Sequence, residues 1–332
     1  MEILATGVQR DERPLLEAAF AGRHDIRCLE TLLTADTLPL AAGYEGVSTS
    51  VNAMLDAPML EGLVRGGTRL VTQRSTGYNN IDLAHAERLG MTVARVADYS
   101  PYAVAEFAWT LAMALNRRIV RAAGRTRDFD LRLDGLLGRD FHGRTVGVIG
   151  TGRIGAAFTA IARGYGMRIL GWDITVNPAC AELGMEYVEL DRIFREADVI
   201  SLHVPLMPST HHLVGARRLA AMKDDALLIN TSRGALVDSA ALVDTLREGR
   251  LGGVGIDVYE EEAGVFFYDK SLEVMTDETL ARLLTFTQVL ITSHQAYYTV
   301  DAVDQIAATT VRNVDDYLAG RITECTLIPK GP

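Results

Sequence analysis

The chain has little cysteine and no long apolar run. Its three cysteines, Cys28, Cys180 and Cys325, are far apart among the 332 residues and form no C-x-x-C motif. This pattern excludes a disulfide framework and favours incidental thiols in a reducing compartment. No uninterrupted apolar stretch approaches the ~18 residues of a membrane-spanning helix, and the first residues lack the basic and apolar regions of a secretory signal. We expect a cytoplasmic protein with no membrane partner.

Positive charge is also in deficit. The 33 lysines and arginines are outnumbered by 43 aspartates and glutamates, so the formal net charge is −10. Such a balance disfavours a nucleic acid or an anionic membrane as partner. A chain of this length with 48 % hydrophobic residues has enough apolar side chains for sizeable cores, and about two domains are expected.

Short apolar strands alternate with amphipathic helices, which is typical of α/β proteins with mostly parallel sheets covered on both faces. The strands expected in the first part are 1–5, 26–29, 46–49, 69–73 and 92–96. A second series, which suits a doubly wound nucleotide-binding sheet, is expected at 145–149, 168–172, 199–202, 226–230, 253–257 and 288–292. Two helices, 101 to about 121 and about 300 to 318, fall outside this alternation.

The most informative stretch is 146–155, which reads V-G-V-I-G-T-G-R-I-G and continues into a helix-compatible run. In this setting Gly150 permits a tight turn, Gly152 lets the backbone approach a pyrophosphate, and Gly155 lets the helix pack on the strand. The N–H groups at the start of the helix, with Arg153 and Ile154, then face the phosphates. The segment predicts a dinucleotide site.

Asp173 indicates which dinucleotide binds. It follows the next apolar strand, at about the spacing from Gly155 expected of a carboxylate that accepts hydrogen bonds from the adenosine ribose. A 2′-phosphate at that position would meet a like charge. We therefore expect NAD as the cofactor.

Three ionisable side chains follow apolar strands of the second series, at the edge where such sheets bind ligands. Arg233, Glu262 and His294 each have an ordinary structural alternative: a surface pair, a solvated acidic run and a core histidine. Together they supply what hydride transfer to a 2-keto acid requires. A guanidinium holds the carboxylate, an imidazole donates the carbonyl proton, and a carboxylate keeps the imidazole oriented and charged.

At these residues the chain resembles the D-isomer-specific 2-hydroxyacid dehydrogenases, over essentially its whole length. Beyond the glycine motif and Asp173, the matching segments are 202–206 with Thr210, 230–234, 257–260 with Glu262, and 293–296. Within the family the chain most resembles the fermentative D-lactate dehydrogenases, on the segment 263–271 and on Tyr99.

The resemblance implies catalytic roles for Arg233, Glu262 and His294. The further cofactor-binding residues that it implies are Val204, Pro205, Thr210, Thr231, Ser232 and Asp257. The implied substrate-binding residues are Thr76 and Gly77, through backbone N–H groups of the loop 74–80, together with Tyr99 and Tyr297.

The resemblance also implies the architecture. A flavodoxin-like substrate domain would comprise 1–99 and 296–332, and a Rossmann NAD domain, 100–295, would be inserted in it, with a cleft between the two. The helix after Pro101 is apolar nearly all round and needs burial on more than one side. A homodimer or higher homo-oligomer would bury it, and so would a domain core.

The expected activity is the NAD-dependent reduction of pyruvate to D-lactate. Two alternatives remain: a larger or phosphorylated D-2-hydroxy acid as substrate, or an NAD-sensing protein similar to transcriptional corepressors of this fold. No metal is expected, because Arg233 and His294 already polarise the carbonyl. The adjacent His211 and His212 are interpreted as surface residues whose side chains diverge.

Overall fold

The computed structural model describes residues 1–329. Two compact units are present: unit 1 comprises Met1–Ser100 and the chain from Tyr298 onward, and unit 2 comprises Pro101–Tyr297. Each unit has its own sheet and its own apolar cores. None of the helices in the described part is both long enough and apolar enough to span a membrane.

Unit 1 is a six-stranded sheet in the order β13-β5-β4-β3-β1-β2. Its elements are β1 (Glu2–Ala5), α1 (Arg13–Phe20), β2 (Asp25–Cys28), η1 (Leu38–Ala41), β3 (Gly46–Thr49), α2 (Ala57–Arg65), β4 (Leu70–Gln73), α3 (Leu83–Arg88), β5 (Thr92–Arg95), α12 (Val300–Leu318) and β13 (Thr326–Ile328). The first five strands are parallel, and β13 joins β5 antiparallel.

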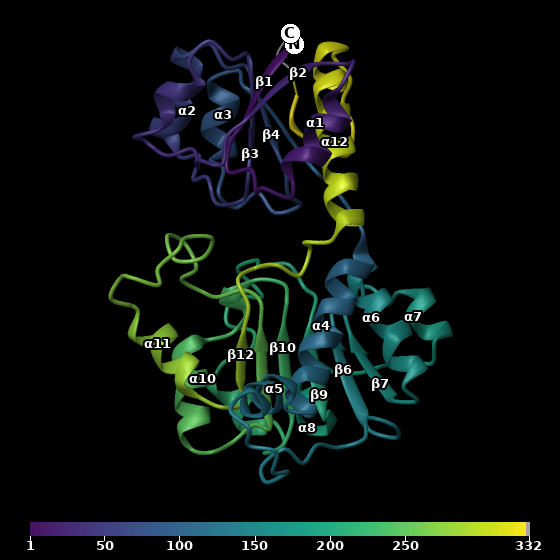
Figure 1. Cartoon of the computed structure of the whole chain (residues 1–332). Helices are drawn as coiled ribbons and strands as arrows, with labels where there is room; N and C mark the ends of the chain where they lie inside the picture. Colours follow the sequence, from purple (N-terminus) through teal and green to yellow (C-terminus); the bar gives the residue numbers. More distant parts are fainter. Residues whose placement is uncertain (330–332) are drawn as a thin grey trace. The chain divides into compact units, whose positions relative to one another are not determined.

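Both faces of the unit 1 sheet are covered by helices. Figure 1 shows α2 and α3 on one side and α1 and α12 on the other. Successive side chains of a strand point to opposite faces, so Ile3 packs in the core with α1 and α12, whereas Leu4 packs in the core with α2. This burial on both faces explains why the strands lack a polar alternation.

Unit 2 is a parallel sheet of seven strands in the order β12-β11-β10-β9-β6-β7-β8. Its elements are α4 (Pro101–Asn116), α5 (Ile119–Arg127), β6 (Thr145–Ile149), α6 (Arg153–Gly164), β7 (Arg168–Trp172), α7 (Pro178–Glu182), β8 (Glu186–Tyr187), α8 (Leu190–Glu196), β9 (Val199–Leu202), α9 (Ala216–Ala221), β10 (Leu227–Asn230), η2 (Gly234–Leu236), α10 (Ser239–Arg247), β11 (Gly253–Ile256), α11 (Glu278–Thr285) and β12 (Val289–Ile291).

The helices of unit 2 also form two layers. In Figure 1, α4, α6 and α7 lie on one side of the sheet, and α10 and α11 lie on the other. The strand order reverses between β6 and β9, which makes the carboxyl ends of these strands the switch point of the sheet. Ligands of doubly wound folds bind at that position.

The expected α/β fold with two parallel-sheet domains is confirmed, with differences in detail. The single helix expected at about 101–121 is two helices, α4 and α5, because Arg118 has a left-handed backbone conformation (φ 52°) that ends the first. The short strands β8 and β13 were not predicted from the sequence. Each has only two or three residues, too few to show a period.

The apolar surface of α4 is largely buried within unit 2. The helix packs against α6, β10 and β11, and nine of its residues are buried. The exposed side chains Tyr102, Glu106 and Thr110 recur every four residues and form one narrow stripe. Of the two explanations that the sequence left open for this helix, the domain core accounts for most of its apolar residues.

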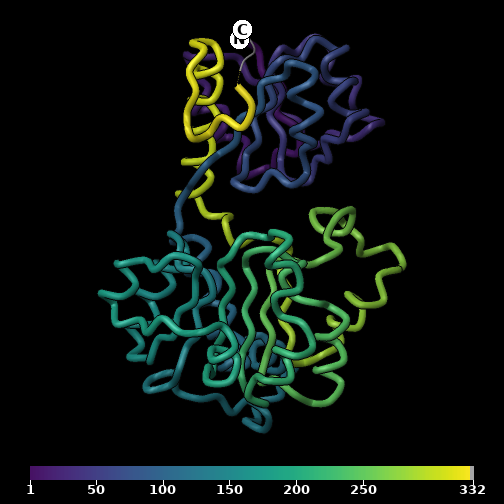
Figure 2. The backbone as a smooth tube through the Cα atoms, turned by 180° about the vertical axis from the view of Figure 1, so that it is seen from behind, coloured from purple at the N-terminus to yellow at the C-terminus, as the bar shows by residue number. Residues whose placement is uncertain are grey.

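The stretch 258–277, between β11 and α11, contains neither helix nor strand. Figure 2 shows it, in green, standing away from the sheet of unit 2. It begins buried at Val258 and Tyr259 and later exposes Leu272 and Val274 almost completely. Because Glu262 lies near its start, the first part of this loop belongs to the candidate site.

Candidate active site

The glycine motif forms the turn from β6 into α6. Gly150 has φ +95°, and a Cβ there would lie 2.6 Å from the backbone carbon of His203. A Cβ on Gly155 would lie 2.0 Å from the carbonyl oxygen of Gly150, whereas a Cβ on Gly152 would meet nothing within 4 Å. Gly150 and Gly155 are therefore required by packing, and Gly152 leaves open space at the helix N-terminus, as a phosphate-binding turn requires.

Asp173 follows β7 directly and is oriented by its neighbours. One carboxylate oxygen accepts hydrogen bonds from the backbone N–H and the hydroxyl of Thr151, at 2.6 and 3.2 Å, and the other accepts from the N–H of Ile174 at 2.7 Å. Tyr187 in turn donates to the Thr151 hydroxyl at 2.9 Å. The sequence did not point to Thr151 or Tyr187, because neither belongs to the glycine motif.

Three hydroxyl groups follow the carboxyl ends of β9 and β10. The Ser232 hydroxyl donates to the Val204 carbonyl at 2.6 Å, and the Thr210 hydroxyl donates to the Pro205 carbonyl at 2.7 Å. Both hydroxyls are therefore used to hold loops. The Thr231 hydroxyl is buried and has no hydrogen-bond partner in the described part of the chain. A buried unpaired hydroxyl at a strand end is a ready partner for a bound ligand.

These observations test whether unit 2 fits a dinucleotide. It has an open glycine turn at the start of a 12-residue helix, an ordered carboxylate at the end of the next strand, and the unpaired Thr231 hydroxyl. The glycine turn suits phosphates, and the Asp173 carboxylate suits ribose hydroxyls. The residues present fit NAD.

The imidazole of His294 lies against the carboxylate of Glu262. Its Nδ1 is 2.9 Å from Oε1, and the two side chains are 16 % and 26 % exposed, so Nε2 is left as the nitrogen that can face a ligand. The other oxygen of Glu262 accepts the N–H of Tyr259 at 3.1 Å. His294 itself has a left-handed backbone (φ 55°). A strained residue of this kind persists only where its surroundings hold it, as at functional sites.

Asp257 supplies part of that support. Its carboxylate is fully buried and accepts the Thr292 hydroxyl at 2.6 Å and the N–H groups of Gln295 and Ala296 at 2.9 and 2.8 Å. The His294 N–H donates to the backbone carbonyl of Asp257 at 2.7 Å. Asp257 was expected at the cofactor; in the structure its carboxylate oxygens hold the loop 292–296.

The electrostatics of the two carboxylates differ. Burial by itself would raise the pKa of Glu262, but the hydrogen bond and positive charge of His294 hold it below the ordinary value. The Tyr259 N–H and the charge of Arg233 act in the same direction. Burial instead raises the pKa of Asp257, in spite of its hydrogen bonds. Glu262 is thus the group kept ionised next to the imidazole.

Arg233 follows β10, the strand next to β11. Its guanidinium donates to the backbone carbonyl of Ser232 at 2.6 Å and forms no salt bridge with a carboxylate in the described part of the chain. The turn that carries it is fixed by Asn230, whose side chain donates to the Arg233 carbonyl at 2.8 Å. A partly buried guanidinium without a carboxylate partner is suited to an anionic ligand.

The loop 74–80 belongs to unit 1. The Gly77 carbonyl accepts from the Ser75 hydroxyl at 2.7 Å, and the Thr76 carbonyl accepts from Arg95 at 2.6 Å. The backbone N–H groups of Thr76 and Gly77 donate to no acceptor within the described residues, and both residues are partly exposed. The loop thus presents two free donors, as an anion-binding turn does.

Arg74, at the start of this loop, is 2 % exposed. Its guanidinium bonds the Glu12 carboxylate at 2.7 Å, the Ser48 hydroxyl at 3.0 Å and the Thr6 carbonyl at 2.8 Å. It is therefore fully engaged in the core of unit 1. A phosphorylated substrate would have needed this cation, so the structure gives that alternative no support.

The two remaining predicted residues lie in different units. Tyr99 is partly buried near the end of the first segment of unit 1, after β5, and Tyr297, also partly buried, is the last residue of unit 2. Both take part in side-chain interactions within the chain. Tyr297 follows the loop that carries His294.

One interpretation of the histidines was wrong. The rings of His211 and His212 do not diverge but stack, with centroids 3.9 Å apart and an angle of 25°. The reason is the left-handed backbone of His212 (φ 49°), which turns its side chain back toward its neighbour. No sequence pattern signalled this conformation, because it is rare outside glycine.

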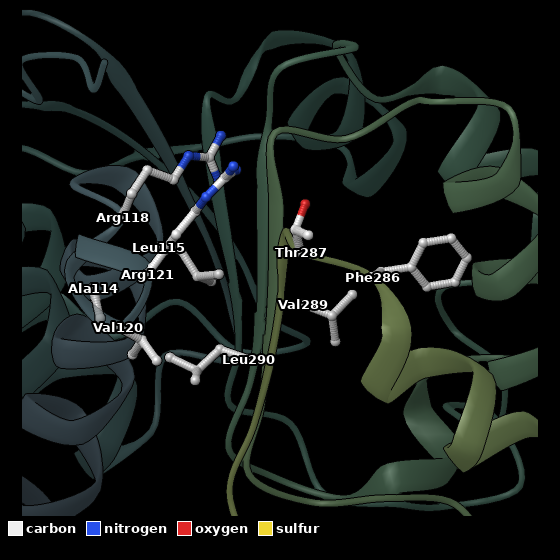
Figure 3. A pocket seen from close by; sticks show the side chains of 9 residues that line it. All are labelled: Ala114, Leu115, Arg118, Val120, Arg121, Phe286, Thr287, Val289 and Leu290. Atoms are coloured by element: carbon white, nitrogen blue, oxygen red, sulfur yellow. The ribbon is translucent and has the colours of Figure 1, made fainter. Parts of the chain in front are cut away.

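A separate pocket of about 300 Å³ lies in unit 2 between α4, α5 and the approach to β12. Figure 3 shows that aliphatic side chains and Phe286 line it and that the guanidinium groups of Arg118 and Arg121 lie side by side over it. Thr287 and Val289 are at the amino end of β12, whereas His294 follows its carboxyl end. The pocket is therefore distinct from the candidate active site.

Comparison with known proteins identifies the class. A family model described as the NAD-binding domain of D-isomer specific 2-hydroxyacid dehydrogenases matches residues 109–296. The chain belongs to this family. It is accordingly an NAD-dependent oxidoreductase acting on D-2-hydroxy acids, and the expected cofactor is confirmed.

Individual relatives narrow the comparison. The chain is 45 % identical over 304 residues to a D-lactate dehydrogenase of Curvularia clavata, covering 92 % of this chain and 87 % of that one. Its structure is similar to apo D-lactate dehydrogenase from Escherichia coli, with a TM-score of 0.90, 39 % identity and coverage of 99 % and 100 %. It is also similar to a structure titled as identifying the pyruvate reductase of Chlamydomonas reinhardtii, with a TM-score of 0.92, 36 % identity and 97 % coverage of each chain.

Proposed function

We propose that this chain is a D-lactate dehydrogenase that reduces pyruvate, with His294, Glu262 and Arg233 as its catalytic residues. The observation that carries the proposal is the 2.9 Å pair of His294 and Glu262, on the loops that follow β12 and β11, with the unpaired guanidinium of Arg233 after β10. These three strands are neighbours in the sheet, and the charge of Arg233 acts on Glu262.

Each side chain has one task. Arg233 binds the substrate carboxylate through parallel N–H groups, a geometry that a guanidinium fork matches. His294, protonated and held through Nδ1 by Glu262, donates the Nε2 proton to the carbonyl oxygen of the substrate. The glycine turn and Asp173 would hold NAD, which in its reduced form would supply the hydride. The buried carboxylate of Asp257 holds the loop 292–296, which carries His294.

The loop of unit 1 completes the proposed substrate binding. The free N–H groups of Thr76 and Gly77 suit a carboxylate, and the Arg95–Thr76 hydrogen bond at 2.6 Å fixes the peptide from which Gly77 donates. We assign Tyr99 and Tyr297 to the substrate as well.

Two observations favour pyruvate over larger 2-keto acids. The Phe267 ring, with its centroid 6.0 Å from that of the His294 imidazole, occupies space beside the reacting group. The relatives named above are two D-lactate dehydrogenases and a pyruvate reductase. The Phe267 ring, on a residue with a left-handed backbone (φ 68°), leaves less room beside the imidazole for a substrate side chain larger than methyl.

The proposal is tested by NADH oxidation with a series of 2-keto acids of increasing side-chain size. We expect kcat/KM to be highest for pyruvate and to fall toward phenylpyruvate. The Phe267→Ala variant is expected to narrow that difference, and Tyr268→Ala, which changes the exposed neighbour, serves as the matched control. A preference of the parent protein for phenylpyruvate would contradict the assignment.

We also propose a homo-oligomer in the cytoplasm. Apolar side chains that follow α5 are far more exposed than is usual for a monomer: Phe129 (90 %), Leu131 (72 %), Leu133 (82 %) and Leu137 (93 %). A run of this kind marks a protein contact, and a second copy is its simplest partner. The three free cysteines suit a reducing compartment.

A further inference from the structure

Two histidines and a glutamate come together on unit 2, on the loops that follow β9 and β11. His211, His212 and Glu260 each offer one ligand atom, and these atoms all lie within 4.8 Å of one another. His211 is exposed, whereas His212 and Glu260 are half-buried, so an ion has access to the cluster from solvent. The Nε2 of His212 lies 2.5 Å from Oε1 of Glu260.

The backbone orients the three groups. The left-handed residue His212 stacks its ring on that of His211, so adjacent residues present nitrogens on the same side. Glu260 is held from behind, because its second oxygen accepts the N–H of Ser239 at 3.3 Å. Its other oxygen, Oε1, is the one that faces His212.

The second ring nitrogen of His212 also has a carboxylate near it. Its Nδ1 lies 3.8 Å from Oδ2 of Asp238, whose Oδ1 caps α10 by accepting the Ala241 N–H at 3.0 Å. A histidine between a metal and an outer carboxylate is the usual arrangement in metalloproteins, because the outer group fixes the ring and its tautomer. Asp238 is suited to that place.

We propose that His211, His212 and Glu260 form a binding site for a divalent transition-metal ion, with Zn²⁺ preferred. Two imidazoles and one carboxylate are a ligand set that Zn²⁺ takes in tetrahedral coordination, with water as the fourth ligand. Donor atoms in such a site are about 3.4 Å apart, as follows from metal–ligand distances of about 2.1 Å. In the structure these atoms lie within 4.8 Å of one another, so side-chain rotation on binding would have to close the remaining gap.

The ion would join two loops of the proposed active site. His211 and His212 follow the turn of Thr210 after β9, and Glu260 precedes Glu262 by two residues after β11. The backbone of Tyr259 and Glu260 packs directly on Gly234, where a Cβ would lie 2.0 Å from the Tyr259 carbonyl carbon. Binding would therefore stiffen the loop of Glu262 and stabilise unit 2. It takes no part in hydride transfer.

The experiment is a calorimetric titration of the chelator-treated, full-length protein with Zn²⁺, with Co²⁺ absorption as a probe of coordination. We expect one ion per chain, a rise in Tm on binding, and the strong visible bands of tetrahedral Co²⁺. Because His211 is exposed, His211→Ala is expected to fold normally, to weaken Zn²⁺ binding at least about tenfold and to lose the Co²⁺ bands. Glu260→Gln is expected to do the same, while NADH binding reports that the variants remain folded.

Two control variants separate this site from other side chains on the surface that could bind Zn²⁺. His85 pairs with Glu61 at 3.2 Å without a third ligand, and Cys325 is a partly exposed thiol. The variants His85→Ala and Cys325→Ser are expected to bind Zn²⁺ as the parent does. If His211→Ala retains the parent affinity, or if the parent binds no Zn²⁺, the site is only a hydrogen-bonded surface cluster and the proposal is overturned. Neither result depends on turnover.

Discussion

At the scale of single residues, the account centres on the hydrogen bond between His294 and Glu262. The lowered pKa of Glu262 means that this group is ionised throughout the neutral range. A carboxylate with a lowered pKa stabilises the fold above its ordinary pKa of about 4.3, and that contribution is lost as the pH falls through the lower, folded value. Near neutral pH, titration of Glu262 itself therefore does not limit the reaction.

The first prediction is for Glu262→Gln, which keeps the shape and removes the charge. The amide no longer compensates the positive charge of the proton donor, and it holds the imidazole of His294 less firmly. We therefore expect kcat for pyruvate reduction to fall by about tenfold or more. Steady-state kinetics at neutral pH measure this. Glu261→Gln, at an exposed neighbour, is the control and should leave kcat unchanged. An unchanged kcat in Glu262→Gln would mean that another group holds the proton donor.

The second prediction concerns Asp173 and the choice between cofactors. This residue directly follows β7, and the backbone N–H groups of Thr151 and Ile174 hold its carboxylate in place. Asp173→Ala should raise KM for NADH and reduce the preference for NADH over NADPH, each by about tenfold or more, since a hydrogen bond to a charged group contributes about 1.5–3 kcal/mol. Steady-state kinetics with both cofactors decide it. Equal kcat/KM for NADH and NADPH in the parent protein would contradict the role.

Much of the proposed site was predictable from the sequence at this scale. Arg233, Glu262 and His294 were found because parallel strands place their carboxyl ends at one edge, so residues far apart in sequence meet there. What was missed depends on dihedral angles and tertiary contacts. The stacked His211 and His212 follow from a left-handed residue, and the support of Asp173 by Thr151 depends on the packing of β7 against β6.

At the scale of elements, the loop after β12 is the part whose rigidity matters most. It is neither helix nor strand. Three hydrogen bonds to the buried carboxylate of Asp257 hold its backbone and side chains instead. The identity of Asp257 as a loop anchor could not be read from the sequence, which shows only an acid after an apolar strand. In the structure the carboxylate of this residue accepts hydrogen bonds from the loop.

The third prediction is that Asp257→Asn lowers kcat without a large change in KM for pyruvate. The amide keeps the volume but replaces one acceptor oxygen by a donor that faces the N–H donors of the loop, so His294 loses its fixed position. We expect a fall in kcat of at least about tenfold, because a misplacement of about 1 Å is enough to cost 10²-fold. Hydrogen exchange at 292–296 provides the second readout. Unchanged exchange and unchanged kcat together would rule out the anchoring role.

Element boundaries show where sequence patterns are adequate. The strands at 46–49, 145–149, 168–172 and 199–202 have the predicted limits, and most residues of each are buried. The helix expected at 101–121 is interrupted at Arg118, which has a left-handed backbone. The sequence did not reveal this break, because it leaves the spacing of apolar side chains unchanged. The antiparallel β13 depends on pairing with β5, a contact that three residues do not reveal.

At the scale of the whole molecule, two α/β units carry complementary sets of residues. Unit 2 has the glycine turn, Asp173 and the three proposed catalytic side chains, and unit 1 has the two free N–H groups of its 74–80 loop. Both sheets and the family were predictable from the alternation of strands and helices and from the spacing of the motifs. The sequence also suggested a homo-oligomer, from the apolar helix after Pro101. The exposed residues that support this proposal in the structure, Leu133 and Leu137, lie elsewhere and follow no period.

The measurement that tests the central claim most directly is the chirality of the product formed from pyruvate and NADH. In the proposed binding mode Arg233 and His294 would hold the carboxylate and the carbonyl oxygen of the substrate, so that only one face of the keto carbon would be turned toward the cofactor. Chiral chromatography of the product after complete NADH oxidation is predicted to show D-lactate alone, and His294→Ala is predicted to slow its formation by about 10²–10⁴-fold. Formation of L-lactate, or undiminished turnover by His294→Ala, would contradict the account.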